Sequence, residues 1–174
     1  MRGSLKPELV LLESGTTDPA EFVRLGISCA QHEDYERGLI YLAEAYKRIV
    51  GTQAVKESKL PPNALSTYGL CLALHKGRVK EAAEFCTVAI EMEFFNAEHY
   101  MNLARVWMAG KARRKALEAI DRGLGVEPRH SGLHRLRVSF GLRKRPVVPF
   151  LPRDNPVNVA LGKVRQSLKE PKKR

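Results

Sequence analysis

The fold of this chain is decided by residues 97–130, AEHYMNLARVWMAGKARRKALEAIDRGLGVEPRH. Apolar side chains recur in the first half of this stretch at i, i+3, i+4 and i+7, the spacing of one face of an α-helix, at Tyr100, Leu103, Ala104 and Trp107. Gly110 interrupts this helix, a second apolar face runs from Ala116 to Leu124, and Pro128 closes the segment. The spacing therefore predicts two short helices joined by a tight turn.

The same two-helix pattern occurs twice more upstream. Residues 62–96 and 19–50 repeat it, with packing positions at Leu65, Tyr68, Gly69, Leu72, Ala82, Cys86 and Ala89, and at Phe22, Leu25, Gly26, Cys29, Gly38, Leu42 and Ala45. Asp18-Pro19 precedes the first copy, and an aspartate followed by proline is a common start of a helix. Because the apolar face of one helix pair is buried only by a neighbouring pair, three copies predict a stacked array.

The three segments resemble the tetratricopeptide repeat (TPR). In that repeat an aromatic residue, a large apolar residue followed by a small one, and a second aromatic mark the first helix, and small residues and a closing proline mark the second. Those places are filled here by Tyr100, Leu103, Ala104, Trp107, Ala116, Ile120 and Pro128. Gly123 replaces the usual second-helix alanine, and Phe94 stands where the second copy would have proline. The resemblance implies an all-α fold of antiparallel helix pairs stacked into a right-handed TPR superhelix.

We expect three parts along the chain. A lead-in at 1–18 precedes a TPR domain at 19–142, and a basic, proline-rich tail follows at 143–174. Within the domain the repeats are 19–50, 62–96 and 97–130, and residues 131–142 form a capping helix. Asp154-Asn155-Pro156 starts a terminal amphipathic helix in the tail, with an apolar stripe of Val157, Leu161, Val164 and Leu168.

Charge is distributed unevenly along the 174 residues. The whole chain carries +11, but residues 1–96 carry −2, residues 97–142 carry +5 and residues 143–174 carry +8. A cationic half of this kind indicates an anionic partner or a solvated basic tail. The composition, 44% hydrophobic and 28% charged, is that of a folded soluble domain, and no apolar run approaches the ~20 residues that span a bilayer.

The sequence carries no motif that points to catalysis, a cofactor or a metal. It lacks a P-loop, a dinucleotide fingerprint and a nucleophile elbow. His130 and His134 are four apart, as two ligands on one helix face would be, but no third ligand is nearby. Cys29, Cys71 and Cys86 are odd in number and widely spaced, which argues against a disulfide framework and suits a reducing compartment. We therefore expect a non-catalytic, cytoplasmic adaptor of bacterial type, with no cofactor and no metal.

The resemblance places candidate binding residues on the concave face that the first helices of the repeats form. They are Arg24, Ile27, Leu70, Met101, Asn102, Arg105 and Met108. Only Asn102 and Arg105 match the clamp with which some TPR proteins hold the C-terminal carboxylate of a chaperone, and the apolar members favour an extended peptide or an amphipathic helix instead. The first hypothesis is a protein or peptide partner in this groove, and the alternative is that the chain's own tail covers it.

Two further functions stay open from the sequence. A nucleic acid or an anionic surface would be bound by a basic patch of Lys111, Arg113, Arg114, Lys115, Arg143, Lys144 and Arg145. Few aromatic residues accompany these cations, which disfavours stacking on bases. A self-assembling scaffold, in which the tail of one molecule fills the groove of another, would make the protein a homo-oligomer.

Overall fold

The computed structural model describes residues 10–11, 13, 15–50, 60–140, 155–157 and 159–161. The chain divides into two compact units, Met1–Ser139 and Phe140–Arg174. Every regular element among the described residues is an α-helix, so the all-α class is confirmed. None of the described helices is both long enough and apolar enough to span a bilayer.

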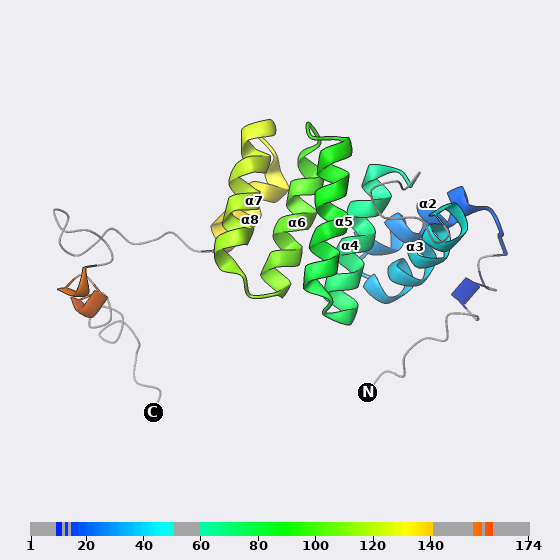
Figure 1. Ribbon diagram of the computed structural model, residues 1–174, viewed down its shortest axis with the longest axis horizontal. Helices are drawn as coiled ribbons and strands as arrows, with labels where there is room; N and C mark the ends of the chain where they lie inside the picture. Colours follow the sequence, from blue (N-terminus) through cyan, green and yellow to red (C-terminus); the bar gives the residue numbers. More distant parts are fainter. Residues whose placement is uncertain are drawn as a thin grey trace, which may run out of the picture. The chain divides into compact units, whose positions relative to one another are not determined.

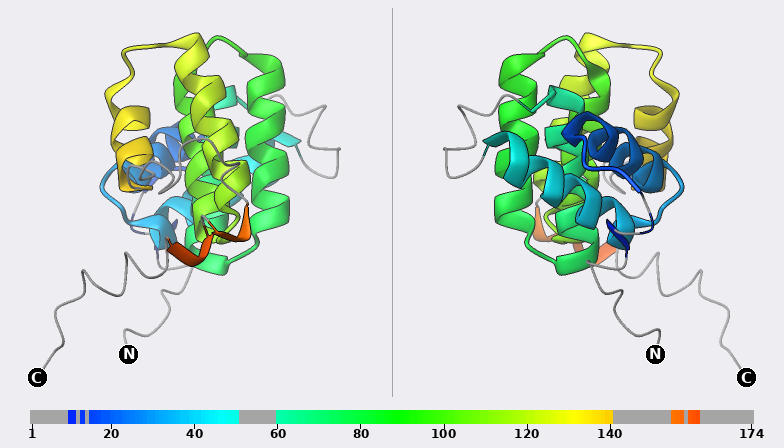
Figure 2. Two further views of the ribbon diagram at one scale, coloured as in Figure 1. Left: turned by 90° about the vertical axis from the view of Figure 1, so that its left-hand side faces the viewer. Right: turned by 90° about the vertical axis from the view of Figure 1, so that its right-hand side faces the viewer.

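The first unit is built of helix pairs that follow one another along the chain (Figure 1). Its helices are α2 (Pro19–Gln31), α3 (Tyr35–Val50), α4 (Pro62–Lys76), α5 (Val79–Met92), α6 (Ala97–Ala109), α7 (Arg113–Val126) and α8 (Ser131–Ser139). Each pair packs within itself, as α2 with α3, α4 with α5, and α6 with α7, and α4 also contacts α2 and α6. Seen end-on, α2 and α8 lie toward one side of the unit and α5 lies toward the other (Figure 2).

Glycines at the crossing points let the two helices of a pair approach closely. A Cβ atom added to Gly69 on α4 would lie 2.5 Å from the carbonyl oxygen of Ala82 on α5. A Cβ atom added to Gly26 on α2 would lie 2.5 Å from Cγ of Leu42 on α3. These distances are far shorter than a van der Waals contact, so the small residues in the sequence pattern mark the points of closest packing.

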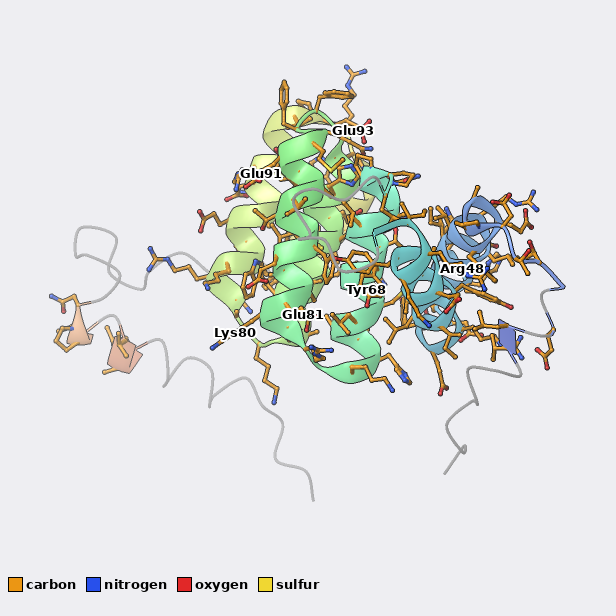
Figure 3. All side chains as sticks on the ribbon, turned by 45° about the vertical axis from the view of Figure 1, so that its right-hand side comes forward. Arg48, Tyr68, Lys80, Glu81, Glu91 and Glu93 are labelled. Atoms are coloured by element: carbon orange, nitrogen blue, oxygen red, sulfur yellow. The ribbon has the colours of Figure 1, made fainter. Side chains whose placement is uncertain are left out.

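Aromatic side chains fill the interfaces around these crossings. Tyr46, Tyr68 and Phe85 form a cluster from α3, α4 and α5, with ring centroids 4.8–5.8 Å apart; Tyr68 is labelled in Figure 3. Burial raises the pKa of the Tyr68 hydroxyl above its usual range, and the nearby Glu81 carboxylate adds to the effect. Trp107, the last position of the apolar face predicted for 97–110, is half-buried and lines a cavity on the outer side of α5 and α7.

The first repeat begins where the sequence indicates. Asp18 Oδ1 accepts a hydrogen bond from the backbone N–H of Ala20 at 3.0 Å, which caps α2 ahead of Pro19. In the lead-in, Val10, Leu11 and Glu13 are helical, and Val10 is buried. Phe94, at the place of the usual proline, lies in the turn after α5 and is 68% exposed.

The second unit is described at 155–157 and 159–161 only. Asn155 Oδ1 accepts from the backbone N–H of Val157 at 2.9 Å and thereby caps a helical segment that begins at Pro156. Val157 and Leu161 are exposed in this unit. The other two members of the predicted apolar stripe, Val164 and Leu168, lie outside the described residues.

The turns inside the three helix pairs share one backbone feature. Glu33, Gly77 and Lys111 occupy the left-handed region, with φ values of 62°, 70° and 56°. Only the middle turn uses glycine, which adopts this conformation without the steric cost that other residues meet.

We expect Lys111→Gly to raise the free energy of unfolding by about 1 kcal/mol, because it removes that steric cost. Gly77→Ala should lower it by a similar amount, since an added Cβ atom would meet nothing within 4 Å and only the backbone conformation is at stake. Urea unfolding followed by circular dichroism measures both changes. Equal stability of the two variants and the unmodified chain would contradict this account of the turns.

Candidate functional site

A cavity of about 520 Å³ lies on the face formed by α2, α4 and α6, the first helices of the three pairs. We call it the groove. Its lining residues are Ile27, Ala30, Gln31, Glu33, Tyr35, Asn63, Ser66, Thr67, Leu70, Glu98, His99, Met101, Asn102 and Arg105. Each helix contributes both apolar and polar side chains, so the groove offers hydrogen-bonding groups beside apolar ones.

Most of the binding residues predicted from the sequence meet in this cavity. Its lining includes Ile27, Leu70, Met101, Asn102 and Arg105. Two other predicted members do not line it. Arg24 is 76% exposed and forms an ion pair with Glu21 one turn away on the same helix, and Met108 lies outside the lining near the end of α6.

The cationic group in the groove is held by an aromatic ring. The Arg105 guanidinium donates a hydrogen bond to the Tyr35 hydroxyl at 2.5 Å, and its carbon lies 5.7 Å from the centre of the same ring. Tyr35 is the first residue of α3 and lies 70 positions from Arg105 in the sequence. Tyr35 stands at helical spacing from Gly38 and Leu42, but this spacing relates positions within one helix and does not pair Tyr35 with a residue of another repeat.

A chain of polar groups, buried except for its first member Glu93, forms the floor between α4 and α6. His99 contacts Glu93 through Nε2···Oε2 at 2.9 Å and Ser66 through Nδ1···Oγ at 3.0 Å. Asn102 Nδ2 donates to the same Ser66 oxygen at 3.2 Å. We call these four residues the polar relay; it starts at Glu93, labelled in Figure 3 beyond the end of α5. Hydrogen bonds from Asn96 and His99 lower the pKa of the Glu93 carboxyl.

The relay contains a serine, a histidine and a carboxylate in contact, the groups of a hydrolytic triad. Ser66 and His99 are both 0% exposed, however. A nucleophile must reach the substrate atom that it attacks, and a fully buried hydroxyl does not. The geometry therefore supports a structural role for these two side chains.

The C-terminal edge of the groove is joined to α8 through His130. Its Nδ1 accepts from the backbone N–H of Leu133 at 3.2 Å, which caps α8, and its Nε2 donates to Glu98 Oε1 at 3.0 Å. A Cβ atom added to Gly132 would lie 2.5 Å from Sδ of Met101. Both Glu98 and Met101 line the groove, so α8 supports its last wall.

The described half of the basic patch lies around the start of α7. Lys111, Arg113, Arg114 and Lys115 are exposed, and α7 begins without a side-chain cap. The Lys115 ammonium lies 4.3 Å from the centre of the Trp107 ring, an attractive cation–π geometry. The other members, Arg143, Lys144 and Arg145, lie outside the described residues.

Two of the three cysteines are buried, and His130 and His134 are held by hydrogen bonds within the protein. Burial raises the pKa of the Cys71 thiol to about 12, and Cys86 is also fully buried with a raised pKa. Within the described ranges, no three histidine, cysteine, aspartate or glutamate side chains gather as metal ligands would. His134 donates from Nε2 to the carbonyl oxygen of Pro128 at 2.7 Å, so it and His130 have separate structural partners.

Comparison with known proteins identifies the architecture. No family model and no curated protein matches the sequence. The structure is similar to a crystal structure described as "YrrB: a TPR protein with an unusual peptide-binding site", with a TM-score of 0.56 and 22% sequence identity. The similarity covers 75% of this chain and 63% of that one, so the chain spans less than two thirds of YrrB. The likeness shows that this chain has the TPR fold, as its sequence pattern implies.

Proposed function

We propose that the protein is a non-catalytic cytoplasmic adaptor that binds a peptide segment of a partner protein in the groove. The observation that carries this proposal is the cavity shared by α2, α4 and α6, in which Ile27, Leu70 and Met101 lie beside the polar groups of Asn102 and Arg105. Apolar lining with a few placed polar groups is typical of a ligand site. The similar fold of a protein described as having a peptide-binding site adds support.

The size of the groove favours a short segment. Neighbouring packed helices lie about 10 Å apart, so the distance from α2 through α4 to α6 is roughly 20 Å. An extended chain covers ~3.3 Å per residue, which corresponds to about six residues. One extended segment, or one face of a short helix, would therefore span all three walls.

Selection of short peptides from a displayed library, followed by calorimetry on the full chain, tests the proposal. We expect Ile27→Glu to weaken binding of the selected peptide by at least about tenfold, or ~1.4 kcal/mol, because it puts a charge against the apolar part of the peptide. Leu74→Glu is the matched control, since Leu74 is also on a first helix but is 37% exposed and does not line the groove. It should change the affinity less than about twofold. Thermal unfolding of both variants checks that they remain folded.

Three other outcomes would contradict the proposal. Equal loss of affinity in the two variants would place the peptide site elsewhere. Failure to select any peptide, together with salt-sensitive retention of the chain on a polyanion, would favour the basic patch as the functional surface, because phosphate binding weakens steeply with salt. Selection that succeeds only after residues 143–174 are removed would indicate that the tail occupies the groove.

A further inference from the structure

The polar relay determines which atom of Asn102 faces the groove. The Glu93 carboxylate accepts hydrogen bonds only, so the Nε2 atom of His99, 2.9 Å from Oε2, carries the proton. A neutral imidazole protonated at Nε2 has a bare acceptor at Nδ1. The single hydroxyl proton of Ser66 thus has two acceptors within reach, His99 Nδ1 at 3.0 Å and the backbone carbonyl oxygen of Asn63 at 3.2 Å.

The direction of these hydrogen bonds fixes the orientation of the Asn102 carboxamide, the last group of the polar relay. Since the two acceptors of the Ser66 hydroxyl proton are His99 and the Asn63 carbonyl, the Ser66 oxygen is left as an acceptor for Asn102 Nδ2, 3.2 Å away. The carboxamide of Asn102 then turns Oδ1 away from Ser66. Oδ1 has no hydrogen-bond partner among the described residues. Every buried side-chain nitrogen or oxygen among these residues does have a partner, so Oδ1 is not buried. Oδ1 is therefore open to the groove, which Asn102 lines.

We infer that Glu93, His99 and Ser66 are positioning residues that lock the Asn102 carboxamide with its oxygen toward the groove. The groove floor at this point selects a hydrogen-bond donor, such as a backbone N–H of the bound segment, and disfavours a carbonyl. This inference rests on the proposed function for the identity of the ligand, but the locked carboxamide is a property of the free protein. Ser66 and His99 border the groove but are both 0% exposed, and Glu93 does not line it, so the three act through Asn102 rather than by contact with a partner.

Nuclear magnetic resonance of the unbound full chain tests the lock. Nitrogen-15 shifts of His99 should show a neutral ring protonated at Nε2, and the Asn102 side-chain amide should be as rigid as the backbone, with an order parameter of about 0.85. Ser66→Ala should lower that order parameter below ~0.6. Thr67→Ala is the matched control, because Thr67 also lines the groove on α4 but is outside the relay, and it should leave Asn102 rigid. A ring protonated at Nδ1, or a rigid Asn102 amide in Ser66→Ala, would overturn the inference.

A second pair of variants distinguishes an effect of the hydrogen bonds on Asn102 from an effect of packing alone. Glu93→Gln keeps an acceptor oxygen for His99 and should preserve both the tautomer and the rigid Asn102 amide. Glu93→Ala removes the acceptor and should yield a mixture of tautomers with a mobile Asn102 amide. If Glu93→Ala leaves both signals unchanged, the carboxylate does not set the direction of the relay.

Selectivity for a hydrogen-bond donor is measured with the peptide selected from the displayed library. Replacing its backbone amides one at a time by esters removes single N–H donors. One replacement should weaken binding to the unmodified chain roughly 3–10-fold, the range for one net hydrogen bond, and should weaken binding to Ser66→Ala less than about twofold. An ester series with no position specific to the intact relay would refute donor selection. If no peptide is selected, the proposed function fails, while the unbound-state signals still confirm or refute the lock.

Discussion

Replacing Phe22 by alanine is expected to lower the free energy of unfolding by about 3–5 kcal/mol, the usual cost of removing a fully buried phenylalanine. Phe22 on α2 is 1% exposed and stacks on Tyr41 of α3, with ring centroids 6.2 Å apart. The Arg48 guanidinium lies 5.0 Å from the centre of its ring on another side. Truncation therefore leaves a cavity and removes a cation–π contact at once. Urea unfolding followed by circular dichroism measures the loss.

Phe94→Ala is the control within the same chain. Phe94 is 68% exposed in the turn between α5 and α6, so its replacement should change stability by less than about 0.5 kcal/mol. Similar losses for the two variants would mean that the first repeat does not pack as described. In a stacked array stability is close to a sum over repeats and their interfaces, so the Phe22 loss should appear first as unfolding of α2 and α3.

Gly69→Ala is expected to destabilise the chain by about 1–3 kcal/mol, although alanine is the better helix former. The added methyl group would lie 2.5 Å from the Ala82 carbonyl oxygen and 3.1 Å from Sγ of Cys86. The first of these is a backbone atom inside α5, so it yields only if the two helices separate. The same unfolding measurement, with the transition followed by helix content, gives the loss.

For Gly125→Ala, also a glycine-to-alanine change in a helix, we expect the opposite effect on the free energy of unfolding. Gly125 lies in α7, and an added Cβ atom would meet nothing within 4 Å. The variant should be more stable to unfolding by about 0.5–1 kcal/mol, the helix-propensity advantage of alanine over glycine. If Gly69→Ala were also stabilising, α4 and α5 would not be in close contact at this crossing.

The helix pairs could be predicted because their cause is local. Tyr100, Leu103 and Ala104 recur at the helical period and are all buried in the structure, and Asp18 caps α2 from the adjacent position. The groove residues Ile27, Leu70 and Met101 could be placed on one face by the same register once the repeat was recognised. Trp107 differs because the outer surface between α5 and α7 is hollow at that point, a property of two neighbouring repeats that no single repeat contains.

The polar part of the groove could not be predicted, because its partners are distant in sequence. Ser66 and His99 are 33 residues apart, and Tyr35 and Arg105 are 70 apart. Repeat spacing relates equivalent positions, whereas these pairs join different positions of different repeats. The sequence pattern does not tell whether His99 is a solvated or a structural histidine, and its 0% exposure in the structure shows that it is a buried link.

The pairing of each helix with its neighbours in the chain also has a kinetic consequence. The contacts run from α2 to α3, from α3 to α4, from α4 to α5 and onward, with α4–α6 as the longest of the major contacts. Loops that close over short stretches of chain cost little entropy, and helical proteins of such local topology fold in about microseconds to milliseconds. During synthesis, at about 5–20 residues per second, each pair therefore has time to dock on the preceding pair before the next has emerged. The molecule is assembled in the order in which it is translated.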